Sequence, residues 1–365
     1  MTSFLPPADI IGVPIDPPLE IEGYLFVMRL AYGGSGEIFA AINRRNELVA
    51  LKILHPHLAS DNKCARAFQE EISLLKRMND PIFPTPISSG KMEGRPYFEM
   101  ELIRGCDLAE IIREFKRREK TPGEEVALAI AFPVAMAVER LHSRHKFVHR
   151  DLSPQNIIVD FAGRVRIADL GIAKDSESAS LTRTGEVKGK AAYISPEQAA
   201  GKKVTAATDL FSLGAIMFEL ITGEPLYPIE RGDIWGQALN CEHDAPKRLS
   251  GRASPELEKL ISAMVAREAS NRPPAEELVA ILDATAKRMG VKLDAETVKR
   301  GVWSVADALY AAFENKLGAY KSGYPSLTPS EARRIERKKA ALSAAIIFFS
   351  FLTMLITLLY KSLYF

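Results

Sequence analysis

Short apolar runs separated by turn residues mark the first interpretable part of the chain. Between residues 24 and 54 these runs alternate with the turn-forming stretches Gly33–Gly36 and Asn43–Asn46, a pattern typical of β-strands joined by tight turns. Between residues 62 and 78, apolar side chains instead recur at helical spacing. These side chains are Phe68, Ile72, Leu75 and Met78. Strands are predicted again near residues 85–102.

Helical patterns dominate the chain beyond residue 102, up to about residue 285. They are interrupted by a predicted strand pair near residues 157–168 and by a long polar loop at residues 174–192. A small β-rich lobe followed by a larger helical lobe predicts an α+β architecture, with one domain over residues 21–285.

The flanking segments differ from this central part. Residues 1–20 contain five prolines and lack a basic start followed by an apolar run, so they predict a disordered, proline-rich arm and no secretory signal. Residues 286–339 are mixed, with some helix expected between residues 295 and 317 and a basic cluster at their end.

An uncharged apolar run, AALSAAIIFFSFLTMLITLLY, occupies residues 340–360. About 20 such residues span the hydrocarbon core of a bilayer, so we expect a transmembrane helix, the alternative being a buried core helix. Five basic residues precede the run and only Lys361 follows it, in the short tail 361–365. This asymmetry predicts a single-pass protein of the cell (inner) membrane, with its main domain cytoplasmic.

Composition narrows the function classes. Lysine and arginine total 48 and aspartate and glutamate 46, a balance that argues against a nucleic-acid binder. The three cysteines, Cys64, Cys106 and Cys241, lie far apart, so neither a disulfide framework nor a zinc site is expected.

A glycine-rich segment between two predicted strands is the first candidate for chemistry. Glycines let a backbone approach phosphate groups and offer N–H groups to them, although a plain hairpin turn is the alternative. The segment reads Leu30, Ala31, Tyr32, Gly33, Gly34, Ser35, Gly36, Glu37 and Ile38.

A lysine within an apolar strand is the second candidate. Lys52 follows Val49, Ala50 and Leu51, and burying its charge is costly unless the charge is paired. Glu71, on the predicted helix, is a suitable partner. The alternative is a lysine whose amine reaches solvent at a strand edge.

The third element is the stretch His149–Asn156, which contains Asp151 and precedes a short apolar run. Asp169 follows in the sequence Asp169-Leu170-Gly171. Phosphoryl transfer needs an oriented nucleophile and neutralised phosphate charge. Two carboxylates and the Asn156 amide, converging on one cleft, supply such groups.

These landmarks, in this order, resemble the eukaryotic-like (Hanks-type) protein kinase family and specifically its bacterial serine/threonine branch. The resemblance covers about residues 24–284. Ala192–Gln198 resembles the end of an activation segment, and Thr208–Gly214 the helix whose aspartate, Asp209, holds the catalytic-loop backbone. Arg272 matches the arginine that pairs with Glu197. The resemblance implies a bilobal kinase-like fold, with ATP and Mg²⁺ as cofactors.

By resemblance, Lys52 holds the α- and β-phosphates of ATP and pairs with Glu71. Asp151 accepts or orients the substrate hydroxyl. The implied Mg²⁺ ligands are Asn156 and Asp169.

The same resemblance implies a slot for adenine and ribose, although plain core packing would explain most of its apolar members equally well. The assignments are Ile38 and Ala50 as roof, Ile158 as floor, Met100 as gatekeeper, the Glu101 carbonyl and Ile103 N–H as adenine partners, and Asp107 for the ribose.

Two positions depart from the family pattern. Ala31 stands where the first loop glycine is usual, and its small methyl group is compatible with loop closure. Ser153 stands two positions after Asp151, where most relatives carry a lysine near the transferred phosphate. Lys190, where a threonine is usual, is expected to reach this position, the alternative being an exposed loop lysine.

Regulation by phosphorylation is expected from Arg150, which can pair with a phosphate on the polar loop. Thr182 and Thr184 lie where bacterial relatives autophosphorylate. A transient homodimer would favour such a reaction in trans, helped by membrane tethering.

The leading interpretation is a membrane-anchored serine/threonine protein kinase acting on protein substrates. A pseudokinase that binds nucleotide or partner proteins is the first alternative, favoured by Ala31 and Ser153. A small-molecule kinase of related fold is the second, and the activation segment ending at Glu197 weighs against it.

Overall fold

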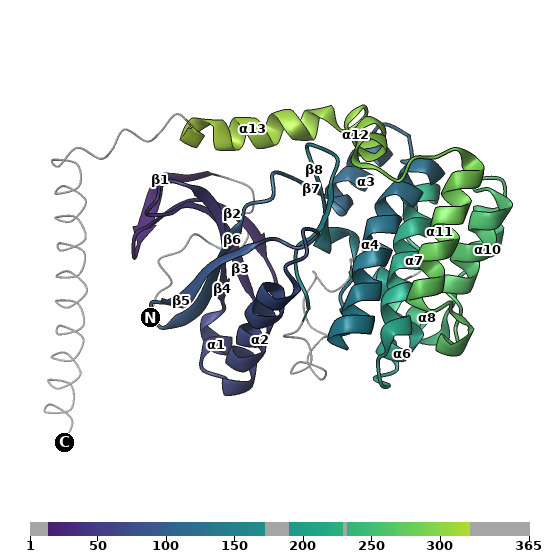
Figure 1. Cartoon of the computed structure of the whole chain (residues 1–365), viewed down its shortest axis with the longest axis horizontal. Coiled ribbons are helices and arrows are strands. Elements are labelled where there is room, and N and C mark those ends of the chain that lie inside the picture. Colours follow the sequence, from purple (N-terminus) through teal and green to yellow (C-terminus); the bar gives the residue numbers. More distant parts are fainter. Residues whose placement is uncertain (1–13, 172–189, 229–231, 322–365) are drawn as a thin grey trace, which may run out of the picture. The chain divides into compact units, whose positions relative to one another are not determined.

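The structure, a computed structural model, describes residues 14–171, 190–228 and 232–321 of the chain (Figure 1). It comprises two compact units, Met1–Lys316 and Leu317–Phe365. Several predicted features lie outside the described residues. They are the first part of the arm, the transmembrane run 340–360, the tail 361–365 and the two loop threonines, Thr182 and Thr184.

The first lobe is an antiparallel sheet of six strands in the order β1-β2-β3-β4-β6-β5. The strands are β1 (Pro14–Ile21), β2 (Tyr24–Tyr32), β3 (Gly36–Ile42), β4 (Leu48–Leu54), β5 (Pro86–Met92) and β6 (Arg95–Glu101). Helices α1 (Pro56–Ala59) and α2 (Asn62–Met78) connect β4 to β5. The strands and the long helix predicted for this lobe are therefore confirmed.

Strand β1 corrects the last part, residues 14–20, of the disordered arm predicted over residues 1–20. Residues 14–21 pair with β2, and Ile15, Leu19 and Ile21 pack on the apolar cluster that contains Phe26 and Phe39. The strand lies at the sheet edge and its register shifts between Pro14 and Leu19. An edge strand with an irregular register tolerates prolines. The number of prolines is therefore no evidence against a strand here, and the apolar residues were the better signal.

The second lobe is helical, with one small sheet of β7 (Gly105–Asp107), β8 (Ile157–Asp160) and β9 (Val165–Ile167). Its helices are α3 (Leu108–Arg117), α4 (Gly123–His145), α6 (Pro196–Ala199), α7 (Ala206–Thr222), α8 (Ile234–Asn240), α9 (Ala245–Leu249), α10 (Pro255–Met264) and α11 (Ala275–Met289). The strand pair predicted near residues 157–168 is β8 and β9. Together the lobes give the predicted α+β, bilobal architecture.

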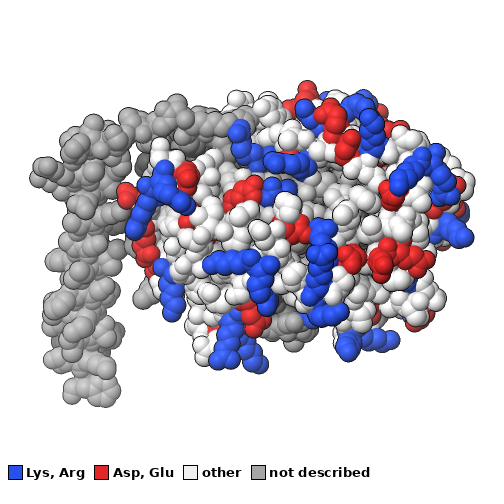
Figure 2. Space-filling model, in the orientation of Figure 1, with Lys and Arg blue, Asp and Glu red and all other residues white. Residues whose placement is uncertain are grey.

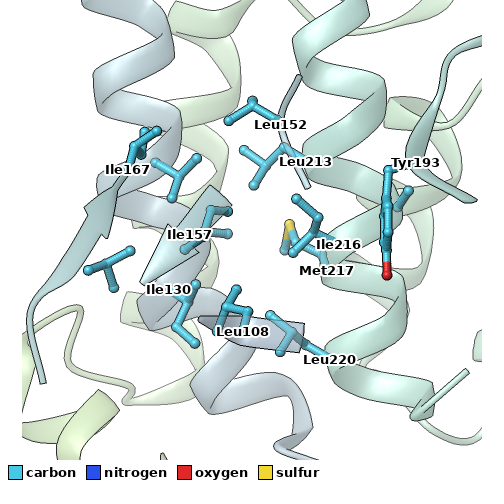
Figure 3. Packing of buried hydrophobic residues seen from close by; sticks show 14 of the residues in the cluster. Leu108, Ile130, Leu152, Ile157, Ile167, Tyr193, Leu213, Ile216, Met217 and Leu220 are labelled. Atoms are coloured by element: carbon cyan, nitrogen blue, oxygen red, sulfur yellow. The ribbon is translucent and has the colours of Figure 1, made fainter. Parts of the chain in front are cut away.

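The core of the second lobe forms around α4 and α7. Ile130 of α4 and Leu213 and Ile216 of α7 share one buried cluster with Leu152 and Ile157 (Figure 3). Leu152 and Ile157 belong to the segment predicted to carry the chemistry, so the core fixes the backbone on which the site is built. Within the described residues, α4 is also the one helix long and apolar enough to cross a membrane, but it is largely buried here as a core helix.

Residues 286–316 also correct the sequence prediction, which ended the domain at residue 285. Helix α11 continues to Met289, and α12 (Ala295–Trp303) packs against α4 with Val298 and Val302 buried. Helix α13 (Asp307–Lys321) follows. The helix expected between residues 295 and 317 is therefore present, but its first part belongs to the core because its apolar face meets α4.

Helices α12 and α13 contact the turn between β8 and β9, and we call α12 with residues 307–313 the C-terminal cap. The Trp303 indole Nε1–H donates to the Asp160 carbonyl at 3.0 Å. The Phe161 ring lies 5.0 Å from the ring of Trp303, 4.5 Å from that of Tyr310 and 5.2 Å from that of Phe313, measured between centroids. An aromatic cluster therefore joins the cap to this hairpin.

Charged side chains of both signs are interspersed over the face of the molecule shown in Figure 2. This mixture agrees with the small net charge of +2. The charged groups that matter for chemistry lie inside instead, where Lys52 forms ion pairs with Glu71 and Asp169.

Candidate active site

The glycine-rich segment forms the end of β2, a turn and the start of β3. Ala31 pairs with Ile38 across the two strands, directly after a shift in register between Arg29 and Ala31, so its methyl group lies at an irregularity of the sheet. Gly33 and Gly34 are exposed at the turn, and the Gly33 N–H donates to the Gly36 carbonyl at 2.9 Å. Gly36 is required by packing, because a Cβ there would lie 2.3 Å from the Ile53 carbonyl oxygen.

His55 holds this turn in place, a role that the sequence did not reveal. Its Nε2 lies 2.7 Å from the Gly33 carbonyl oxygen, and its backbone N–H donates to the Ser35 carbonyl at 3.2 Å. The turn is therefore fixed to β4 from outside the glycine segment, by a residue just after the predicted lysine strand.

The buried Lys52 lies at the centre of an ion-pair triad with Glu71 and the partly buried Asp169. Its Nζ is 2.7 Å from Glu71 Oε1 and 2.9 Å from Asp169 Oδ1, and its side chain is only 4% exposed. The alternative of a solvent-reaching lysine is therefore wrong. Helix α2 positions Glu71, because Phe68, Ile72 and the carboxylate occupy its buried face.

The triad strongly perturbs the protonation of its members. Burial alone would lower the pKa of Lys52, but the Asp169 and Glu71 carboxylates outweigh it and raise the pKa. Burial, with the nearby Asp169 charge, raises the pKa of Glu71 to about 7 despite the attraction of Lys52. Burial opposes ionisation of Asp169 too, yet Lys52 holds its pKa well below the usual range. Two carboxylates thus share one buried cation.

The catalytic loop, residues 149–156, is held by Asp209 of α7. The fully buried Asp209 carboxylate accepts from the backbone N–H groups of His149 at 2.8 Å and Arg150 at 2.7 Å, and it lies 2.8 Å from His142 Nε2. These bonds support Arg150 in a left-handed backbone conformation with φ of 65°. Such a conformation costs about 1–3 kcal/mol and persists only where the surroundings impose it.

Asp151 and Asn156 are joined within the loop. The Asn156 amide Nδ2 donates to the Asp151 carbonyl at 2.6 Å and to its carboxylate at 2.9 Å. Asn156 directly precedes β8 and Asp169 comes two residues after β9, so one hairpin carries both predicted Mg²⁺ ligands.

Lys190 reaches this site from another segment. Its Nζ lies 3.0 Å from Asp151 Oδ2 and 3.4 Å from Asn156 Oδ1. The alternative of an exposed loop lysine is therefore wrong. The side chain of Ser153 is buried, 1% exposed, and its Oγ has no hydrogen-bond partner within the described structure.

The predicted adenine residues are brought together in part. Ala50 and Met100 face each other as a β4–β6 pair and are both buried, and Ile158 pairs with Asp107 across β8 and β7. The Asp107 carboxylate accepts from the Glu110 N–H at 2.7 Å and thereby caps α3. Burial raises the pKa of Asp107 to about 6.

Glu101 and Ile103 lie in the segment between the lobes and also line a hollow of about 390 Å³. The rest of this hollow is formed by neighbouring residues, the β8–β9 turn and Tyr310, and the other predicted adenine residues do not line it. The Glu101 carboxylate is paired with Arg166 at 2.6 Å, so its side chain is fixed toward β9.

The predicted pairing of Glu197 with Arg272 is confirmed. Two nitrogens of the buried Arg272 guanidinium donate to the Glu197 carboxylate at 2.7 and 2.8 Å. Thr208 Oγ1 donates to the same carboxylate at 2.8 Å, and Ser195 caps α6. The segment after Lys190 is thus anchored to α7 through Thr208 and to the residues before α11 through Arg272.

Comparison with known proteins identifies the fold and the family. Residues 24–281 match the family described as "Protein kinase domain". The chain belongs to the protein kinase family. The predicted resemblance is therefore confirmed, and so is its bacterial serine/threonine branch, because relatives in that branch match over most of this domain.

Two curated relatives and one solved structure illustrate the likeness. The serine/threonine-protein kinase PknL of Mycobacterium tuberculosis is 30% identical over 71% of this chain and 64% of its own length. The tyrosine-protein kinase MasK of Myxococcus xanthus is 31% identical over 70% of this chain and 42% of its own length. The chain therefore spans less than two thirds of either relative.

The crystal structure of a mutant PknI kinase domain from Mycobacterium tuberculosis matches with a TM-score of 0.56 and 23% sequence identity. The match covers 74% of this chain and 98% of that domain, and it shows the fold.

Proposed function

We propose that this chain is an ATP-dependent protein kinase that phosphorylates serine or threonine hydroxyls. The observation that carries the proposal is the convergence of Lys52, Glu71 and Asp169 from three separate segments, within 2.7 to 2.9 Å of the lysine amine. Asp151 and Asn156 complete the set. Maintaining the buried Glu71 carboxylate and the partly buried Asp169 carboxylate beside one buried cation is costly, and phosphate handling gives that arrangement a purpose.

The reaction follows from the groups present. Asp151 accepts the proton of the substrate hydroxyl as that oxygen forms a bond to the γ-phosphorus of ATP. The bond between the γ-phosphorus and the bridging oxygen breaks, and ADP leaves with the electron pair. Lys52 orients the α- and β-phosphates, and Glu71 keeps the lysine in position.

Asn156 and Asp169 would hold the metal ion. A carboxylate and an amide oxygen are hard donors of the kind that Mg²⁺ prefers, so their chemistry fits. When bound, Mg²⁺ would neutralise part of the phosphate charge.

The test is phosphate incorporation by the full chain, purified in detergent and incubated with ATP and Mg²⁺. Intact-mass measurement should show added phosphates of about 80 Da for the wild type and none for Asp151→Asn, as expected for loss of the base. Wild-type protein that binds nucleotide but never consumes it would favour the pseudokinase alternative.

The acceptor residue is part of the proposal. PknL is named a serine/threonine kinase and MasK a tyrosine kinase, so both types of acceptor occur among named relatives. Phosphoamino-acid analysis of the labelled protein should give phosphoserine or phosphothreonine, and phosphotyrosine alone would contradict this part.

We further propose membrane anchoring through residues 340–360 and control by autophosphorylation of Thr182 and Thr184 in a transient homodimer. The uncharged apolar run and its basic flank support the first, and the position of the two threonines supports the second. Deleting residues 340–360 should release the protein from membranes. Thr182→Ala combined with Thr184→Ala should lower activity, and unchanged turnover would remove the regulatory idea.

A further inference from the structure

We infer that Lys190 is a catalytic residue, the cation that stabilises the transferring phosphoryl group in place of the charge that Ser153 of the catalytic loop lacks. The inference rests on the proposed function and goes further, because it assigns transition-state stabilisation to a side chain outside the catalytic loop.

The position of the amine is the first argument. Lys190 Nζ contacts the two loop residues that face the reaction, Asp151 at 3.0 Å and Asn156 at 3.4 Å. The ammonium group therefore contacts the base and one of the two proposed metal ligands.

The charge balance of the site is the second argument. The cleft brings together the carboxylates of Glu71, Asp151 and Asp169, whereas Lys52 is already shared by two of them. The reaction adds a polyphosphate to this negative cluster. A second cation beside Asp151 offsets that charge where it develops, which is the most effective place for it.

The neutral side chain at position 153 is the third argument. Ser153 is buried on the catalytic loop, and its Oγ is without a hydrogen-bond partner in the part of the chain that the structure describes. A serine supplies no positive charge at this position, and the cation that contacts Asp151 there is Lys190, from another segment.

The backbone next to Lys190 is suited to deliver that cation. Lys190 immediately precedes a short helical turn, Ala191–Tyr193, whose three side chains are buried. The Tyr193 carbonyl accepts from Ser212 Oγ at 2.9 Å, and its hydroxyl donates to Glu219. Both partners lie on α7, the helix that also holds the catalytic loop through Asp209. One helix therefore sets the position of the base and of the cation.

The decisive experiment compares Lys190→Met with Lys203→Met, a matched control on an exposed lysine beyond the anchored turn. Removing the catalytic cation should lower kcat by about 10²–10³-fold, the range seen when one stabilising donor is lost. The KM for ATP should change by less than about threefold, since the interaction is made mainly in the transition state. The control should match the wild type.

A charge-relocation variant separates a catalytic role from a structural one. Ser153→Lys, introduced into the Lys190→Met protein, returns an ammonium group to the catalytic loop and should recover at least about tenfold in kcat. The melting temperature of every variant is measured as well, so that a change in kcat can be distinguished from a loss of folded protein.

The outcomes are distinct. An undiminished kcat in Lys190→Met, a loss confined to the KM for ATP, or a loss that Ser153→Lys does not recover would each overturn the inference while the wild type remains an active kinase. Wild-type and Lys203→Met proteins that both fail to transfer phosphate would instead refute the proposed function, and the inference with it.

Discussion

The charged cleft and the C-terminal cap both act on the hairpin of β8 and β9, but by different physical means. The cleft uses the two ends of the hairpin, where Asn156 and Asp169 take part in ionic and hydrogen-bonded contacts. The cap uses the turn, where the Phe161 ring meets three aromatic rings. The first kind of contact depends on residue chemistry and the second mainly on shape. We therefore expect cleft substitutions to change turnover and cap substitutions to change stability.

The largest expected effect is in the cleft. Asp151→Asn keeps the shape of the side chain but removes the group that accepts the proton, so kcat should fall by about 10²–10⁴-fold. Steady-state phosphorylation of a generic protein substrate measures the loss. The melting temperature should stay near that of the wild type. A large drop would contradict the expectation that cleft substitutions change turnover and not stability.

The largest expected effect in the cap comes from Trp303→Ala. It removes a partly buried ring and the hydrogen bond to the Asp160 carbonyl, which should cost about 2–4 kcal/mol of unfolding free energy. Trp303→Phe keeps a ring and loses only the N–H, so it should cost about 1 kcal/mol. Urea unfolding distinguishes the two, and equal costs would mean that packing is unimportant here.

Gly163→Ala tests how closely the cap approaches the turn. Gly163 has φ of 87°, and a Cβ there would lie 2.0 Å from the Ala295 carbonyl oxygen of α12. The combined strain and clash should cost about 2–3 kcal/mol. Gly251→Ala is the matched control, with φ of 74° and open space around it, and should cost about 1 kcal/mol. Equal losses of unfolding free energy for the two variants, measured by urea unfolding, would show that the turn has room for a Cβ at position 163.

The smallest expected effect concerns the ion pair between Arg118 and Asp307, 2.8 Å apart at the surface of the cap. Solvent screens this pair, so Asp307→Asn should leave the melting temperature unchanged within error. A drop as large as that of Trp303→Ala would show that charge, and not ring packing, holds the cap.

The sequence predicts the residues of the cleft well and those of the cap poorly. The physical reason is that contacts in the cleft depend on residue chemistry, whereas those in the cap depend on shape. The pairing of Lys52 with Glu71 is predictable because a buried cation requires a carboxylate, Asp169 because phosphate chemistry admits few residue types, and Lys190 because of the resemblance to a known family. The cap presents ordinary apolar and aromatic residues, such as Val298 and Trp303, whose partners are set by the fold.

Local contacts within the site were also beyond prediction. The bond from His55 to the Gly33 carbonyl and the capping of α3 by Asp107 use side chains that serve equally well in many other places. In the same way, the five prolines of residues 1–20 predict a disordered arm, although the apolar residues among and just after the last three of them complete a sheet edge.

The packing of α12 on α4 also determines which fragments of this chain can exist by themselves. A fragment limited to the family match, residues 24–281, would stop inside α11 and omit Val298 and Val302, which are at most 1% exposed. Their removal would uncover an apolar strip on α4, and such strips promote aggregation in water. Expression from residue 14 to residue 321, the end of α13, keeps that strip covered, so the boundary of a recombinant fragment should follow the ends of the helices.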